Sequence, residues 1–148
     1  MRTFEYQRPA SLPDVLAALA APESRVLAGG MSLIPSMKLR LATPDTLVDL
    51  HGVGGLDTIA VTADAVTVGA MTTHAAVADS VAVQVAIPAL AALAGGIGDP
   101  QVRNRGTLGG AIANNDPAAD YPAALVALGA LAVFVGGVRL IDNTVLRP

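Results

Sequence analysis

The sequence predicts a mixed α+β fold, and two observations support that prediction. Segments with helix-capping residues alternate with short valine-rich segments, and one of these, Val66-Thr67-Val68, has the two-residue periodicity of a half-buried strand. Hydrophobic residues make up 53% of the 148 residues and charged residues only 14%. This composition can bury a core and is far from that of a disordered chain.

The first 50 residues are expected to form two helices and two strands. Ser11 suits a helix cap, Pro13 the first turn, and Asp14 complements the helix dipole. The expected elements are a helix that runs through Val15–Ala20 and stops near Pro22, a strand over 25–28 ended by Gly29-Gly30, a helix from Ser32 that carries Met37, Leu39 and Leu41 before Pro44 ends it, and a strand over 46–50.

The rest of the chain is expected to mix a hairpin with helices. The expected elements are strands over 58–61 and 65–70 that turn around 62–64, a helix-rich stretch over 73–94 interrupted near Pro88, a turn-rich segment over 95–110 too polar in its middle to be core, a helix over 120–128 and a strand over 131–135. The uncharged run over 122–138 approaches the length of a membrane span, but its glycines and valine-rich second half favour a buried helix followed by a buried strand.

Composition excludes several classes of function. The net charge is -3 and the basic residues are dispersed, so no nucleic-acid partner is expected. The absence of cysteine excludes disulfides, Fe–S ligation, zinc–thiolate sites and thiol catalysis from this chain. The first six residues lack the apolar segment of a signal peptide. We therefore expect a cytoplasmic protein without a transmembrane span.

A first glycine-rich segment, Leu27-Ala28-Gly29-Gly30-Met31-Ser32-Leu33, joins an expected strand to an expected helix. Glycines allow the backbone to approach a ligand closely, and successive amides before a helix form a concave anion site. Ser32 would add a hydroxyl donor. Such a segment is suited to a pyrophosphate. The alternative is a tight turn in which Ser32 caps the helix.

A second glycine-rich segment runs from Arg103 through Gly106-Thr107-Leu108-Gly109-Gly110 to Asp120. Thr107 could donate to a phosphate oxygen or a ribose, and Asp120 could accept from sugar or ribityl hydroxyls. The alternative is a solvated loop with Asp120 capping the next helix. Neither segment has the spacing of a Rossmann fingerprint or a Walker A loop. Two anion-binding loops so far apart suggest a ligand held between two subdomains.

These motifs resemble the FAD-binding domain of molybdopterin dehydrogenases, the family of the medium flavoprotein subunit of carbon monoxide dehydrogenase and of xanthine dehydrogenase. The resemblance is carried, in order, by Ala28-Gly29-Gly30-Met31-Ser32-Leu33-Ile34-Pro35-Ser36-Met37-Lys38-Leu39-Arg40-Leu41, Leu47-Val48-Asp49-Leu50, Val68-Gly69-Ala70-Met71-Thr72-Thr73-His74, Arg105-Gly106-Thr107-Leu108-Gly109-Gly110 and Asp116-Pro117-Ala118-Ala119-Asp120. It covers roughly residues 1 to 134.

The resemblance implies a two-subdomain FAD-binding fold of the vanillyl-alcohol oxidase/PCMH type with FAD between the subdomains. The cofactor-binding residues it implies are Ala28, Gly29, Gly30, Met31, Ser32 and Leu33 at the pyrophosphate, Thr107, Gly109, Gly110, Ala111 and Asp120 near the flavin, and Ile97 and Gly98 lining the cofactor. Many relatives carry asparagine at the position of Ala111, so this chain lacks a side-chain amide there, while the loop amides are expected to remain.

The resemblance also implies partner subunits. A large subunit with the molybdenum cofactor would oxidise the substrate, and a small subunit with 2Fe–2S clusters would relay electrons to non-covalently bound FAD. No acid, base or nucleophile is expected in this chain, so it is not expected to act alone. His51 and His74 are isolated and favour loop or cap roles over metal ligation. For Arg103 and Arg105, contact with phosphate, contact with a partner and solvation all remain open.

The resemblance divides the chain into an N-terminal FAD-binding subdomain over 1–56, an incomplete second subdomain over 57–134 and a divergent tail over 135–148. It predicts a flavoprotein that is truncated at its C-terminal side. One alternative is a catalytically inactive remnant that binds at most a nucleotide or a partner. Another is an unrelated nucleotide-binding α+β module with convergent loops.

Overall fold

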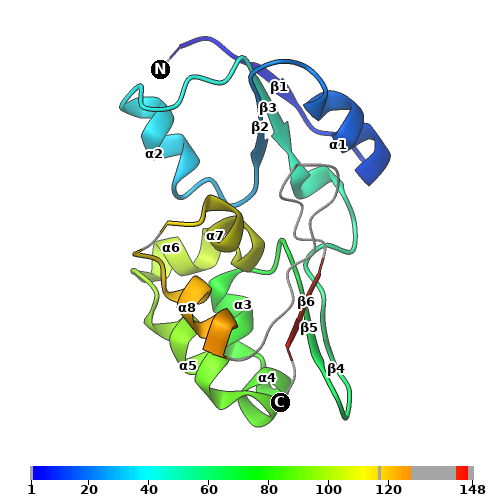
Figure 1. Cartoon of the computed structure of the whole chain (residues 1–148), viewed down its shortest axis with the longest axis vertical. Coiled ribbons are helices and arrows are strands. Elements are labelled where there is room, and N and C mark those ends of the chain that lie inside the picture. Colours follow the sequence, from blue (N-terminus) through cyan, green and yellow to red (C-terminus); the bar gives the residue numbers. More distant parts are fainter. Residues whose placement is uncertain (1, 117, 128–142, 147–148) are drawn as a thin grey trace. The chain divides into compact units, whose positions relative to one another are not determined.

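The computed structural model describes residues 2–116, 118–127 and 143–146. The chain divides into two compact units, Met1–Gly55 and Leu56–Pro148. Each unit contains its own three-stranded sheet (Figure 1). The prediction of a mixed α+β fold is confirmed.

The first unit is built on a parallel sheet of β1 (Glu5–Gln7), β2 (Ser24–Leu27) and β3 (Thr46–Asp49), with β3 in the centre. All four residues of β3 are buried, as expected for a central parallel strand covered on both faces. Gln7 lies opposite Val48 and Leu27 opposite Asp49, so all three strands end at the same edge of the sheet.

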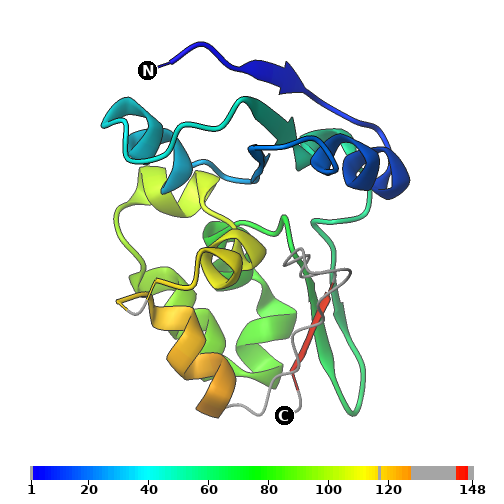
Figure 2. The ribbon, with the colours of Figure 1, turned by 45° about the horizontal axis from the view of Figure 1, so that its top comes forward.

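The helices of this unit are α1 (Leu12–Leu19) and α2 (Leu33–Lys38), and the strands run between them in Figures 1 and 2. The predicted cap of α1 is confirmed. Ser11 Oγ accepts the Asp14 N–H at 3.3 Å and donates to Asp14 Oδ2 at 2.6 Å. Val15 is fully buried and anchors the helix in the unit.

The predicted extension of α2 toward Pro44 is wrong. The helix ends at Lys38, because Arg40 adopts a left-handed φ of 61° and the Leu41 N–H turns back to Ser36 O at 2.8 Å. A left-handed residue after the last turn is a common helix stop, but it is usually glycine. With arginine in that position the sequence did not signal it.

The second unit contains an antiparallel sheet of β4 (Ile59–Val61), β5 (Val66–Gly69) and β6 (Asn143–Leu146), in that spatial order. The predicted hairpin of β4 and β5 is confirmed. Thr62 closes it, because its N–H donates to Ala65 O at 2.8 Å and its Oγ1 accepts the Ala65 N–H at 3.1 Å. Strand β6 lies in segment 135–148, where the sequence predicted no element.

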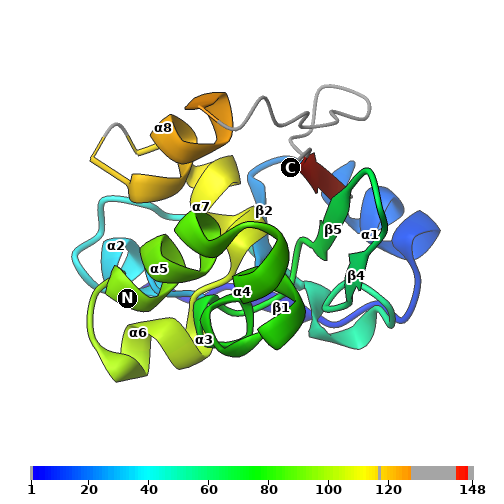
Figure 3. The ribbon, with the colours of Figure 1, turned by 90° about the horizontal axis from the view of Figure 1, so that it is seen from below.

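Helices lie together beside this sheet (Figure 3). They are α3 (His74–Asp79), α4 (Val81–Ala86), α5 (Pro88–Gly96), α6 (Pro100–Arg105), α7 (Leu108–Asn114) and α8 (Asp120–Ala127). Pro88 opens α5, which confirms the predicted interruption, and α8 confirms the helix predicted over 120–128. The strand predicted over 131–135 lies outside the described residues.

The segment over 95–110 is more helical than its turn residues indicated, although its polar middle does lie outside the core, because no residue of α6 is buried. Helix α6 occupies its middle, with Asp99 Oδ1 accepting the Val102 N–H at 2.9 Å and Pro100 as the first helical residue. This Asp-Pro pair is an ordinary helix start. The glycines on either side of it favoured a loop prediction, although they only mark the two ends of the helix.

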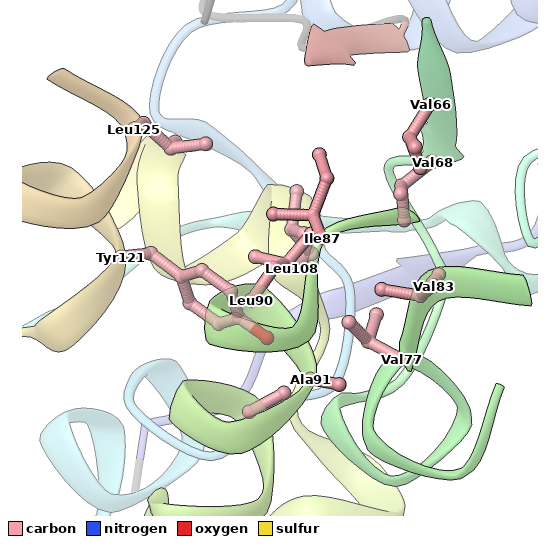
Figure 4. Packing of buried hydrophobic residues seen from close by; sticks show 11 residues of the cluster. Val66, Val68, Val77, Val83, Ile87, Leu90, Ala91, Leu108, Tyr121 and Leu125 are labelled. Atoms are coloured by element: carbon pink, nitrogen blue, oxygen red, sulfur yellow. The ribbon is translucent and has the colours of Figure 1, made fainter. Parts of the chain in front are cut away.

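The core of the second unit joins its sheet to its helices. Valines of β5 face the apolar side chains of α3, α4 and α5 (Figure 4). The buried members of this cluster are Val66, Val68, Val77, Val83, Ile87, Leu90, Ala91, Ala94, Leu108, Tyr121 and Leu125. Within the described ranges, no helix has the length and apolar character needed to cross a membrane.

Candidate functional site

The first glycine-rich segment leaves the end of β2 in a conformation that requires glycine. Gly30 has a φ of +75°, and a Cβ there would lie 3.1 Å from Ile34 Cγ1. The Gly30 carbonyl accepts the Ile34 N–H at 3.1 Å, which ties the segment to α2.

Four consecutive amides of this segment are available to a ligand. Among the described residues, the N–H groups of Gly29, Gly30, Met31 and Ser32 donate no hydrogen bond. Ser32 is exposed and makes no side-chain capping bond to α2, so the alternative of a serine cap is wrong. Successive unpaired amides form an anion site. This arrangement supports the pyrophosphate assignment of the segment.

The second segment behaves differently, because its amides are already paired. Leu108 N–H donates to Thr72 O at 2.9 Å, Gly109 N–H to Ala70 O at 3.0 Å, and Gly110 N–H to Thr107 Oγ1 at 3.1 Å. The Ala111 N–H donates to Thr107 O at 3.0 Å. The expectation that these amides remain available to a phosphate is therefore wrong.

The first glycine of this pair, Gly109, serves packing. A Cβ on Gly109 would lie 2.6 Å from Ala70 O and 2.7 Å from Ala70 Cα, so only glycine allows α7 to approach that backbone. Thr107 is buried and caps α7. Ala111 is half-buried against the hydrophobic cluster. The alternative of a solvated loop is also wrong, because residues 108–114 form helix α7. Contact between these residues and a cofactor stays a prediction.

Asp120 keeps an unpaired carboxylate. It is the first residue of α8, is exposed, and forms no side-chain hydrogen bond within the described part of the chain. The preceding turn is closed by Asp116, whose Oδ1 accepts the Ala118 N–H at 2.9 Å. The carboxylate of Asp120 is therefore exposed, and its contact with hydroxyl groups of a ligand stays a prediction.

Ile97 and Gly98 form the turn between α5 and α6. Ile97 packs partly against the core, and Gly98 has a φ of +47°. Arg103 Nη1 donates to Ile97 O at 3.1 Å and to Gly98 O at 3.3 Å. This stabilisation of the turn is a role for Arg103 that the sequence did not indicate, whereas Arg105 is exposed, as solvation would require.

His74 lies in the core of the second unit and was not predicted there. The backbone N–H of His74 donates to Gly106 O at 3.0 Å. The centroids of the His74 and Tyr121 rings lie 5.3 Å apart. Burial lowers the pKa of His74 and, with the charge of Asp120, raises the pKa of Tyr121. Among the described residues, the buried side-chain atoms without a hydrogen-bond partner are Thr72 Oγ1, His74 Nδ1 and Tyr121 OH.

A second polar cluster, also missed by the sequence analysis, lies at the end of β3. Asp49 is buried, and its Oδ2 accepts a short hydrogen bond from Tyr6 OH. Its Oδ1 accepts the His51 N–H at 2.9 Å and lies 2.6 Å from His51 Nδ1. Burial opposes ionisation of Asp49, but the hydrogen bonds from Tyr6 and His51 hold its pKa below the usual 3.8. The sequence signal was an aspartate directly after the apolar pair Leu47-Val48.

The histidines are not part of a metal site in the described residues. No group of three or more histidine, cysteine, aspartate or glutamate side chains there is arranged to hold a metal ion. The chemistry that the described residues can support is binding: open amides at 29–32, an open carboxylate at Asp120 and the polar cluster at Asp49.

The sequence matches the family described as the FAD-binding domain in molybdopterin dehydrogenase over residues 2–141. The chain belongs to this family. The predicted resemblance is confirmed, and the match extends beyond residue 134, where the resemblance was expected to end.

Curated members of the family share the same sequence pattern. The chain is 44% identical over 110 residues to the nicotine 6-hydroxylase medium subunit of Paenarthrobacter nicotinovorans, covering 74% of this chain and 39% of that protein. It is also 44% identical over 111 residues to the carbon monoxide dehydrogenase medium chain of Hydrogenophaga pseudoflava, again covering 74% and 39%. The chain thus spans about two fifths of the length of these relatives.

Solved structures of family members have the same fold. Quinoline 2-oxidoreductase from Pseudomonas putida 86 is similar with a TM-score of 0.92 and 31% identity, covering 99% of this chain and 59% of that one. Carbon monoxide dehydrogenase from Hydrogenophaga pseudoflava is similar with a TM-score of 0.91 and 34% identity, with the same coverage.

Proposed function

We propose that this chain binds FAD non-covalently as part of the flavoprotein component of a molybdenum hydroxylase. The single observation that carries the proposal is the family match, which includes the segment whose four amides are open at residues 29–32. The proposal includes the two-subdomain fold of the PCMH type, with FAD-binding subdomains over 1–56 and 57–134 and a tail over 135–148.

Each segment would contribute differently to binding. The amides of Gly29–Ser32 would donate to the pyrophosphate, because several N–H donors can meet its charge without a buried lysine. Asp120 would accept from hydroxyl groups of the cofactor. Since the amides of Leu108–Ala111 are paired internally, that segment would contribute backbone shape and van der Waals contact. Ile97 and Gly98 would line the cofactor.

The bound flavin would supply the redox chemistry, taking electrons from the 2Fe–2S clusters of a small subunit and passing them to an external acceptor. A large subunit with the molybdenum cofactor would select and oxidise the substrate. This chain contributes no catalytic acid or base in the proposal, so its role is to bind and orient. We therefore expect no turnover from the isolated chain.

Flavin binding can be tested on the purified chain. We expect the purified chain to carry flavin, seen in its visible absorbance spectrum and identified as FAD after extraction. If the chain is purified without flavin, we expect it to quench the fluorescence of added FAD during a titration. A colourless protein that also fails to bind added FAD would contradict the proposal for this chain. Gly30→Val should weaken FAD binding, with Gly54→Val as the control, because a Cβ on Gly54 would meet no atom within 4 Å. Gly109→Val is unsuitable, because it disrupts packing directly.

Assembly can be tested by co-expression with large and small subunits of a molybdenum hydroxylase. We expect the three chains to co-purify and to reduce an acceptor faster than the two partners alone. Acceptor reduction that is no higher with this chain than without it would contradict the electron-transfer role.

A further inference from the structure

The parallel sheet of the first unit gathers three polar segments at one edge. Arg8 follows β1, residues 29–32 follow β2, and His51 follows β3. Leu27 lies opposite Asp49 in the register of β2 and β3, so two of these segments leave neighbouring strands at the same level. Neighbouring strands lie about 4.8 Å apart. Ligands of open sheets bind beyond the carboxyl ends of parallel strands.

The histidine at this edge is held in a defined orientation. The side chain of Asp49 is 8% exposed and that of His51 is 44% exposed, with His51 Nδ1 2.6 Å from Asp49 Oδ1. The Tyr6 hydroxyl donates a hydrogen bond to the other carboxylate oxygen, Asp49 Oδ2. A carboxylate that accepts from Nδ1–H sets both the tautomer and the direction of an imidazole ring. The Nε2 atom of His51 makes no hydrogen bond to any described residue.

The free ring nitrogen suits the phosphate–ribose part of a nucleotide. With Nδ1–H committed to Asp49, Nε2 donates to a phosphate oxygen when the ring is protonated and accepts from a ribose hydroxyl when it is neutral. Arg8 adds a positive charge beside it, since Arg8 Nη2 donates to His51 O at 3.0 Å. Asp49 caps the turn after β3 by accepting the backbone N–H of His51. That capping bond does not require the imidazole ring of His51, so it does not explain why the ring is also bonded to Asp49.

We propose that His51, oriented by Asp49 and Tyr6, binds the phosphate–ribose portion of the dinucleotide whose pyrophosphate is held by Gly29–Ser32. This inference rests on the proposed FAD function and adds to it a side chain that the sequence analysis set aside. The chemical class of ligand is a nucleoside diphosphate, the half of FAD that riboflavin lacks.

The test compares the binding of FAD, ADP and riboflavin to the full chain and its variants by fluorescence and calorimetric titration. His51→Ala should weaken FAD and ADP binding roughly tenfold or more, as loss of a hydrogen bond to a charged group implies. Riboflavin binding should not change. His51→Gln should recover part of the loss, because its amide both donates and accepts. The control, Arg25→Ala, removes an exposed charge from within β2 and should change no affinity.

The outcomes separate this inference from the proposed function. A wild-type chain that binds no FAD contradicts the proposed function. Binding of FAD by the wild type with unchanged ADP affinity in His51→Ala overturns only the role of His51. Equal losses for ADP and riboflavin in a variant that unfolds at the wild-type denaturant midpoint also overturn it.

Discussion

Gly30 and Gly109 show that glycine can be required for different physical reasons. Gly30 adopts a left-handed φ that other residues tolerate poorly, whereas Gly109 lies so close to Ala70 that no Cβ fits. Both occur in double-glycine segments that look alike in sequence. Within the described part of the chain, the amides of the first segment lack acceptors, whereas those of Leu108–Ala111 are paired.

Replacing Gly30 with alanine should lower the free energy of unfolding by about 1–2 kcal/mol, because alanine must adopt a φ of +75° beside Ile34. Urea denaturation measures this change. Gly54→Ala is the matched control and should be nearly neutral, since a Cβ there meets nothing within 4 Å. Equal stability of the Gly30 variant and the wild type would show that the left-handed conformation is not required.

The buried His74 predicts a pH dependence of stability. Its folded pKa lies below 6.5 because burial disfavours the charged ring, so the unfolded chain binds more protons as pH falls below 6.5. The stabilisation is fully present above pH 6.5 and is lost progressively as pH falls through the folded pKa. His74→Phe keeps a ring against Tyr121 and removes this dependence.

The measurement is the free energy of unfolding in denaturant at a series of pH values below and above 6.5. The wild type should lose stability toward acid in this window more steeply than the His74→Phe variant. If the two proteins show the same slope, the neutral buried ring does not contribute to it.

The helices of the chain are short, and their starts depend on caps. Helices of six to nine residues are marginal without tertiary contacts, so satisfying their first N–H groups decides where they begin. A side chain accepts the N–H three residues further along at Ser11, Thr73, Ser80, Asp99 and Thr107.

Removing the cap of α6 should test this dependence. Asp99→Ala should cost about 1 kcal/mol of unfolding free energy, because the Val102 N–H loses its acceptor. Asp99→Asn is the control and should cost only a few tenths, since asparagine caps about as well. Thermal or urea denaturation distinguishes them. A loss as large for asparagine as for alanine would assign the effect to charge rather than to capping.

Each of the two units has its own sheet and buried side chains. Leu47 and Val48 of the central strand are buried in the first unit, and the cluster around Leu90 is buried in the second. Each unit therefore buries the apolar faces of its own elements, and the stability of the second unit depends on side chains that α3, α4 and α5 contribute.

Truncation of a core side chain should expose this dependence. Leu90→Ala should lower the free energy of unfolding by about 2–5 kcal/mol, because Leu90 is fully buried. Val85→Ala on α4, where the side chain is 79% exposed, should stay within about 0.5 kcal/mol of the wild type. Similar losses for both variants in urea denaturation would contradict the placement of Leu90 in the core.

Local signals predicted much of the fold and the family. The cap at Ser11, the hairpin around Thr62 and the helix start at Pro88 depend on residues within a few positions of one another, so they are legible in sequence. The double-glycine segments and their flanking residues indicated the family for the same reason. The left-handed stop at Arg40 and the helix α6 were missed, because nearby glycine and proline suggested other boundaries.

Tertiary structure decided which groups a ligand can reach. The amide of Gly109 is paired because Ala70, far away in sequence, supplies its acceptor, whereas the amides at 29–32 have no acceptor among the residues that the structure describes. Tyr6 and Asp49 are 43 residues apart and meet because β1 pairs with β3. Sequence patterns therefore indicated two glycine-rich segments and a family. Only the folded chain distinguished an open segment from a packed one, because hydrogen-bond partners from distant strands occupy or leave free each amide.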